Sequence, residues 1–358
     1  MDFLKFKQPQ ILKFSCAVFF AFTLSGCHLG YLFKSAGGEL DILSRRVSID
    51  EALQDKKISE EDKRKIRLSQ EAHKFAETQM GLVSTKNYTS YVALDRPYAS
   101  YVVSAAPKWE LKNYTWRFPF VGEVPYKGYF NENEAKEEEK SLQDLKLDTY
   151  LRGVSAFSTL GWFRDPLLSS MLKGEDHDLV NTIIHETVHA TLYIKSSADF
   201  NERLAVFIGN FGTEKFYLQR EGENSATVKK IHQENEDEKT FSNFITQQVH
   251  ELEAWYQAHP EKSEEEREKK FLDIQQIFKT QFLPKMQTQN YSHFADIKLN
   301  NARLLLYKTY MADLSDFQKL FDLVHGDIHL FLEKCKSLQA DPKPEEGLRK
   351  LIESQKSL

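Results

Sequence analysis

The spacing of hydrophobic and polar residues changes several times along the chain, and each change predicts a different element. Two stretches, "SIDE" from Ser48 and "SEED" from Ser59, place a serine three residues before an acidic residue, which is the spacing of a helix capping box. The second predicts a helix that runs to about Met80 and ends at Gly81. Residues 87–130 are rich in Tyr, Val, Phe and Thr, with interspersed Pro and Gly, which predicts strands of a mainly antiparallel sheet.

The middle of the chain alternates between helix and strand patterns. Residues 131–145 carry an acidic run that predicts a solvated helix, residues 148–163 return to the composition of a strand, and residues 164–166 predict a turn. Residues 176–194 have apolar positions at helical spacing. A short polar loop separates them from a second helix, which is expected to begin at about Phe200.

From residue 223 onward the pattern is helical, and the charged runs contain apolar residues at helical spacing. We therefore expect a signal peptide at 1–26, an N-terminal helical stem at 27–85, a core of sheet and central helices at 86–222, and a helical C-terminal part at 223–358. The fold class this implies is α+β, with a small, mainly antiparallel sheet beside a pair of central helices.

Composition narrows the possible partners. The 358 residues carry a net charge of −5, and no basic run is dense enough to indicate nucleic acid as the main partner. Of the three cysteines, Cys16 and Cys27 lie in the N-terminal segment. Cys335 is then the remaining thiol of the body, so we expect no internal disulfide.

In the first 27 residues, basic residues, an apolar run, small residues and a cysteine follow one another in the order found in bacterial export signals. Three lysines precede an apolar run at 14–24, which is shorter than the ~20 apolar residues that span a bilayer. The stretch "LSGC" that ends at Cys27 resembles a lipobox, which implies cleavage before Cys27 and lipid attachment to it; the alternative is an ordinary signal peptide. Because His28 stands where aspartate favours inner-membrane retention, we expect a lipid anchor in the outer membrane of a Gram-negative bacterium, facing the periplasm.

Candidate chemistry is concentrated in "NTIIHETVHATLY", residues 181–193. On a helix, His185 and His189 stand one turn apart on the same face and can aim two imidazole nitrogens at one metal ion. Glu186 lies ~100° further round the helix. There it can reach a water molecule beside the metal without being a ligand. The alternative is a pair of hydrogen-bonded histidines in the core, since apolar neighbours bury this helix.

A catalytic zinc site needs a third protein ligand, and Glu202 in "DFNERLAVF" is the preferred candidate. If the first helix continues about a turn and a half past His189 and the chain then reverses, Glu202 falls in the first turn of the next helix and can face the histidines. Two alternatives stay open. Asp199 and Glu202 have capping-box spacing, so Glu202 can be a cap only, and Glu214 is a weaker candidate on a different face.

Other residues are candidates for contact with substrate. Tyr310 and Tyr307 in "NNARLLLYKTYMADL" can donate to a developing oxyanion, with Tyr310 preferred, or they can pack between helices. Leu160 and Gly161 in "SAFSTLGWF" can form a strand edge that pairs with an extended peptide, or an ordinary core strand. Arg152 can bind a substrate carboxylate or form an ion pair.

These motifs together resemble zinc peptidases of the gluzincin group. "HETVH" followed by "NERLA" is similar to the paired HExxH and NExxA stretches of that group's aminopeptidases. The chain resembles more closely a family of bacterial lipoproteins described as predicted aminopeptidases, through stretches such as "FPFVGEVPYKGYF" and "RGVSAFSTLGWFRDPLLSSML". The resemblance implies a gluzincin-like fold and one zinc ion per chain, with His185, His189 and Glu202 as ligands and Glu186 as catalytic base.

The sequence departs from the gluzincin pattern in two places. It has no G-x-M-E-N stretch, which binds the amino terminus of the substrate in the better-known aminopeptidases. In addition, many gluzincins have an acidic residue four positions after the glutamate ligand, and this chain has Val206 at that position.

We expect a lipid-anchored zinc peptidase that acts on peptides in the periplasm. The alternatives are a non-catalytic envelope lipoprotein that serves as a binding or assembly module, and an amidase for cell-wall peptides.

Overall fold

The computed structural model describes residues 26–118, 122–156, 164–261, 263–310 and 314–356. The chain divides into two compact units, residues 1–45 and 46–358. The described part of the first unit is helix α2 (Gly26–Ser44). None of the helices in the described ranges combines the length and apolar character that a membrane crossing requires.

The second unit begins with the two capped helices that the sequence predicts. Ser48 caps α3 (Ile49–Gln54) in a complete capping box, and Ser59 caps α4 (Glu60–Thr78) by accepting a hydrogen bond from the backbone N–H of Asp62. The chain leaves α4 through Gly81, which has a φ of +68°. The helix ends at Thr78, slightly before the predicted Met80, and a side chain at the φ of Gly81 is disfavoured, which explains the glycine where the chain turns away.

Short strands form three small sheets within the described residues. They are β1 (Val47–Ser48), β2 (Ser90–Val92) and β8 (Leu167–Leu168) in the first, β6 (Tyr126–Tyr129), β3 (Ser100–Pro107) and β7 (Leu147–Val154) in the second, and β4 (Trp116–Phe118) and β5 (Gly122–Val124) in the third. All pairs are antiparallel except β2 with β8. The predicted α+β class is therefore confirmed, but the strands are shared among several sheets rather than forming one.

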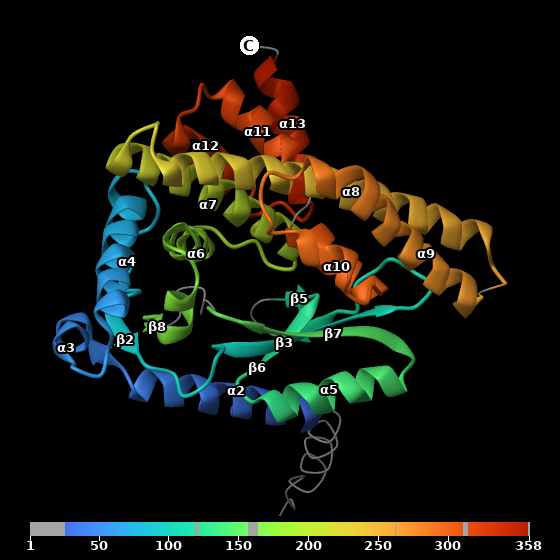
Figure 1. Ribbon diagram of the computed structural model, residues 1–358, viewed down its shortest axis with the longest axis horizontal. Coiled ribbons are helices and arrows are strands. Elements are labelled where there is room, and N and C mark those ends of the chain that lie inside the picture. Colours follow the sequence, from blue (N-terminus) through green and yellow to red (C-terminus); the bar gives the residue numbers. More distant parts are fainter. Residues whose placement is uncertain (1–25, 119–121, 157–163, 262, 311–313, 357–358) are drawn as a thin grey trace, which may run out of the picture. The chain divides into compact units, whose positions relative to one another are not determined.

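The β6–β3–β7 sheet lies between two helices, α5 (Glu132–Asp144) and α10 (Asn301–Tyr310), which cover its opposite faces (Figure 1). Ala106 and Tyr150 on one face pack against Ala302 and Leu305 of α10. Thr149 on the other face donates a hydrogen bond to Glu139 of α5. Because successive side chains of a strand point to opposite faces of the sheet, Tyr150 contacts the helix on one face and Thr149 the helix on the other.

The rest of the unit is helical. Its other helices are α6 (Asp176–Thr191), α7 (Ala198–Glu221), α8 (Ala226–Ala258), α9 (Glu264–Ile277), α11 (Ser315–Leu323), α12 (Ile328–Lys336) and α13 (Pro344–Lys356). An aromatic cluster centred on Phe241, Phe244, Phe278 and Phe294 packs α8 onto the segments that follow it. A buried ion pair between Arg267 of α9 and Asp148 ties these helices to β7.

Candidate metal centre

Helix α6 carries the motif of residues 185–189, as the sequence predicts. It starts in a capping box between Glu175 and Asp178. Its apolar residues Ile183, Ile184 and Val188 are fully buried, and the helix packs against α4 and α7. The burial of one face leaves His185 and Glu186 partly exposed on the other face.

The helix ends earlier than the sequence suggests. The prediction extends it to residue 194, but α6 stops at Thr191 and Leu192 is already extended. The buried side chain of Asn201 accepts a hydrogen bond from the backbone N–H of Ile194 (2.9 Å) and donates one to its carbonyl oxygen (2.8 Å). These two bonds satisfy the reversing backbone, so the chain turns within a few residues and α7 can begin at Ala198.

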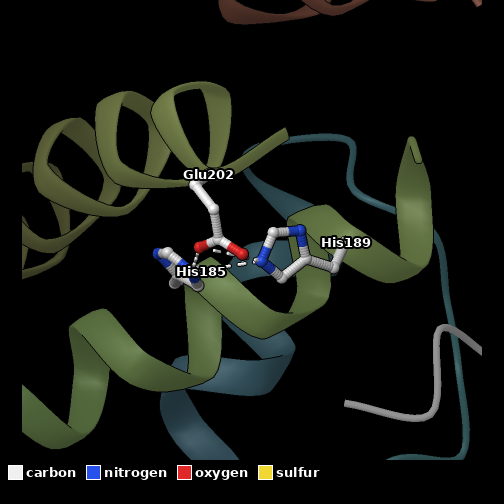
Figure 2. A group of neighbouring side chains, drawn as sticks. All are labelled: His185, His189 and Glu202. Atoms are coloured by element: carbon white, nitrogen blue, oxygen red, sulfur yellow. Dashed lines mark hydrogen bonds and ion pairs between the residues drawn. The ribbon is translucent and has the colours of Figure 1, made fainter. Parts of the chain in front are cut away.

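The reversal brings Glu202 of α7 to the two histidines, as Figure 2 shows. The Nε2 atoms of His185 and His189 are 3.2 Å apart. Glu202 Oε2 lies 3.5 Å from His185 Nε2 and 3.7 Å from His189 Nε2. Tetrahedral zinc with ligand bonds of ~2.05 Å places its ligand atoms about 3.3 Å apart. The spacing of the three donors therefore fits one small metal ion.

Two alternatives for these residues find no support in the described contacts. Helix α7 has Ser197 as its N-cap with no side-chain cap bond, and Asp199 instead accepts a hydrogen bond from Thr309 of α10 (2.9 Å), so Glu202 is not a capping residue. The weaker candidate, Glu214, pairs with His232 of α8 at 3.2 Å. The cluster of three donors thus contains Glu202 and not Glu214.

The carboxylate of Glu202 favours the charged form of His189, and the imidazoles of both histidines favour the charged form of Glu202. Burial by itself raises the pKa of Glu202, but the charges and hydrogen bonds of His189 and His185 outweigh it and hold the pKa well below the usual range. Burial lowers the pKa of His189, yet the carboxylate of Glu202 outweighs it and raises that pKa. A carboxylate that is only 6% exposed is therefore stable as an anion here, which is the form that binds a metal.

The other ring nitrogen of His189 has no partner among the residues that the structure describes. Its Nδ1 is buried and makes no hydrogen bond in the described part of the chain. A buried ring nitrogen is expected to have a partner both in a packed core and in a metal-ligating histidine. Val206, which occupies the position of the usual acidic residue, cannot supply the bond. Among the described residues the ring is thus held by its Nε2 contacts with His185 and Glu202.

Tyrosines surround the cluster, and the sequence analysis did not single them out. Tyr126 on β6 donates a hydrogen bond to Glu202 Oε1 at 3.4 Å. Burial and the charge of Glu202 raise the pKa of Tyr193. Burial, the charge of Glu186 and that of Asp165 raise the pKa of Tyr88. No fixed spacing links these residues to the motif, so only the folded chain shows that they meet.

Tyr88 is held in an unusual backbone conformation. Its φ is +59°, a value that is rare for an aromatic residue. Its N–H donates to the carbonyl of Asp165 and its carbonyl accepts from Gln70, both at 2.7 Å. The ring meets His73 edge-on. Such constraint is common near functional sites, and here it fixes a tyrosine whose pKa is raised by burial and by the charge of Glu186.

Several of the other predicted residues, or their side chains, fall outside the described part of the structure. Tyr310 is the last residue of α10, and its side chain is outside the described part of the structure. Tyr307 packs edge-on against Phe241 and Phe294, which supports its packing interpretation. Leu160 and Gly161 lie outside the described residues. Cys27 lies in α2, but its side chain is not described.

Comparison with known proteins assigns the family. A family model described as "Putative aminopeptidase" matches residues 30–350, nearly the whole chain. The chain belongs to this family. The match supports a peptidase function, and hence a hydrolase. No curated protein and no solved structure matches the chain significantly.

The family description agrees with the chemistry of the site. Two imidazoles and a carboxylate form a donor set for a divalent metal ion such as zinc. Glu186 follows the first histidine directly and is partly exposed beside the cluster. The site therefore combines metal donors with a separate carboxylate that is available for proton transfer.

Proposed function

We propose that the protein is a zinc-dependent peptidase that hydrolyses peptides with a water molecule activated at this site. The arrangement of His185, His189 and Glu202 carries the proposal, because three donors from two helices converge at the spacing of one zinc ion. When bound, zinc acidifies water and polarises a carbonyl group.

The residues of the chain then have separate tasks. His185, His189 and Glu202 hold the ion, and Glu186 accepts a proton from the attacking water and delivers it to the leaving amine. Tyr310 is the proposed hydrogen-bond donor to the developing oxyanion. Support for Tyr310 comes from its neighbour Thr309, which bonds to Asp199 three residues before Glu202.

The proposal extends to the surroundings of the site and to the membrane anchor. Leu160 and Gly161 are the proposed strand edge for the substrate, because they directly precede the segment that leads to α6. Lipid attachment at Cys27 would anchor the protein to the membrane, facing the periplasm, with the outer membrane as the proposed location. Fractionation of cells that express a Cys27→Ser variant tests the anchor; unchanged membrane association would contradict it.

Metal analysis of the full-length protein tests the central proposal. We expect about one zinc ion per chain in the parent and much less in a Glu202→Gln variant of equal folding, together with peptide hydrolysis in the parent only. A well-folded parent that takes up no metal when zinc is supplied would contradict the proposal. It would leave a non-catalytic binding or assembly module as the better description.

A further inference from the structure

A pocket of about 460 Å³ opens at one end of the β6–β3–β7 sheet, where β3 ends, β7 begins and α9 starts. Its lining combines the apolar side chains of Pro107, Trp109 and Leu147 with two lysines and two glutamates. None of these residues belongs to the metal centre. Small-molecule sites commonly have volumes of ~300–1,000 Å³ and combine apolar walls with a few polar or charged groups. The size and the lining therefore fit a second ligand site.

Buried side chains hold the loop that forms one wall of this pocket. Asn301 of α10 is fully buried, and its Nδ2 donates to the carbonyl oxygens of Pro107 (2.9 Å) and Lys108 (3.0 Å). The guanidinium of Arg267, which is only 2% exposed, lies over the ring of Trp109 with 5.6 Å between its Cζ and the ring centroid. Trp109 is thus fixed by buried neighbours, while its half-buried ring also lines the pocket.

Glu264 of α9 is a fixed hydrogen-bond acceptor on the pocket wall. Its Oε1 accepts a hydrogen bond from Lys108 Nζ (2.7 Å), and its Oε2 lies 3.5 Å from Arg267 Nη1. Arg267 is held in turn by its ion pair with buried Asp148. The hydrogen bond from Lys108 outweighs desolvation and lowers the pKa of Glu264. The carboxylate is therefore ionised at neutral pH, and its remaining lone pairs can accept hydrogen bonds from a ligand.

The charges of the lining limit the kind of ligand. Lys108 and Glu264 already neutralise each other, and the two other charged residues, Lys146 and Glu110, are of opposite sign. A strongly anionic or cationic ligand would therefore meet a like charge as well as an opposite one. Hydroxyl groups suit such a lining, because each can donate to a carboxylate and accept from an ammonium group.

Lys146 and Trp109 add two further features. Lys146 follows α5 with a φ of +63°, a conformation that favours glycine, and its ammonium group has no ion-pair partner within the described ranges. It is therefore a donor that is available to a ligand. Trp109 offers a flat apolar surface. A sugar ring matches both, since its C–H face is apolar and its hydroxyls project around the edge.

We propose that this pocket binds a neutral saccharide, with the apolar face of a sugar ring against Trp109 and adjacent hydroxyls bonded to Glu264 and Lys108. Asn301 and Arg267 are positioning residues for the pocket wall. The inference goes beyond the proposed peptidase function and does not depend on it, because the two sites share no residue. Saccharide binding would hold the protein on a glycan independently of the metal centre.

Calorimetry with defined sugars tests the inference. Full-length protein, in a detergent without a sugar headgroup, is titrated with the neutral disaccharides cellobiose, maltose and N,N′-diacetylchitobiose. Digalacturonic acid is the anionic probe and trialanine is the peptide probe. Glu264→Gln is the test variant, and Glu265→Gln, the next residue of α9 and outside the pocket, is the matched control. Lys146→Ala, at an exposed position, is a second test variant in case Glu264→Gln alters folding.

We expect at least one neutral disaccharide to bind with a dissociation constant of about 1 mM or lower. Glu264→Gln should weaken this binding roughly 10-fold, the loss of a charge-assisted hydrogen bond, and Lys146→Ala should weaken it by a smaller factor. Glu265→Gln and the metal-ligand variant Glu202→Gln should leave it unchanged. The peptidase proposal can therefore fail without affecting these results.

Three results would overturn the inference. The first is that no neutral disaccharide binds, and the second is that digalacturonic acid or trialanine binds more tightly than every neutral disaccharide. The third is that the test variants bind as the parent does, or that Glu265→Gln or Glu202→Gln, at equal folding, loses as much affinity as Glu264→Gln.

Discussion

Replacing Tyr126 by phenylalanine should weaken metal binding without removing a ligand. The two oxygens of Glu202 have different neighbours: Oε2 faces both histidines, and Oε1 accepts the hydroxyl of Tyr126. The hydroxyl therefore restricts the rotation of the carboxylate and favours the orientation in which Oε2 points at the metal. Residues that orient ligands in this way commonly contribute 10- to 100-fold to metal affinity.

The geometry sets the expected size of the effect. The oxygen–oxygen distance of 3.4 Å between Tyr126 and Glu202 is long for an O–H···O bond. A hydrogen bond to a charged group contributes about 1.5–3 kcal/mol when its geometry is good. We therefore expect the lower end of the range, roughly a 10-fold loss of zinc affinity, or about 1.4 kcal/mol.

Competition with a chromophoric zinc chelator measures this directly on the full-length protein. Tyr193→Phe is the matched control, because its hydroxyl also lies within the electrostatic reach of Glu202 but makes no hydrogen bond to it among the described contacts. We expect the control to change zinc affinity by less than about twofold. Equal affinities for Tyr126→Phe and the parent, or equal losses in both variants, would refute the positioning role.

Three further predictions concern the neighbouring residues. Glu186→Gln should keep zinc and lose at least ~10²-fold of peptide hydrolysis, and loss of the metal instead would contradict its role as base. Asn201→Ala leaves the N–H and carbonyl of buried Ile194 without partners, so we expect about 2–4 kcal/mol of destabilisation in chemical unfolding; an unchanged midpoint would show that the loop does not need the side chain. The hydrogen bond from His177 to Glu234 raises the pKa of His177, so its stabilisation is complete below pH ~6.5 and lost as pH rises through the raised pKa. His177→Gln should flatten that part of the stability profile, and an unchanged profile would exclude this pair as the cause.

The sequence predicts the parts of the molecule that depend on local spacing. The capping serines and the separation of His185 from His189 follow from periods of three to four residues, and the acidic run at 131–145 indicated the helix that is observed there. The placement of Glu202 rested on two assumptions, that the first helix continues about a turn and a half past His189 and that the chain then reverses. The helix instead ends at Thr191, but Asn201 completes the reversal earlier than expected, so Glu202 still reaches the two histidines.

Contacts between distant segments could not be predicted in the same way. Tyr126 reaches Glu202 from a strand 76 positions earlier, and nothing in the spacing of the chain relates the two. The division of the strands into several small sheets also depends on long-range pairing, such as the parallel contact of β2 with β8. Patterns of hydrophobicity mark the strands but do not select their partners.

The register between α6 and α7 positions the three side chains of the metal centre. Asn181 lies eight residues before His189, and Asn210 lies eight residues after Glu202, so the two helices run antiparallel with matching separations. Gly209 keeps them close at this point, since a Cβ there would lie 3.3 Å from Asn181 Oδ1. A slip of one turn would separate Glu202 from the histidines and Asn210 from Asn181 together. The position of Glu202 relative to His185 and His189 is therefore set by two packed helices rather than by a loop, which provides the precise spacing that a metal site requires.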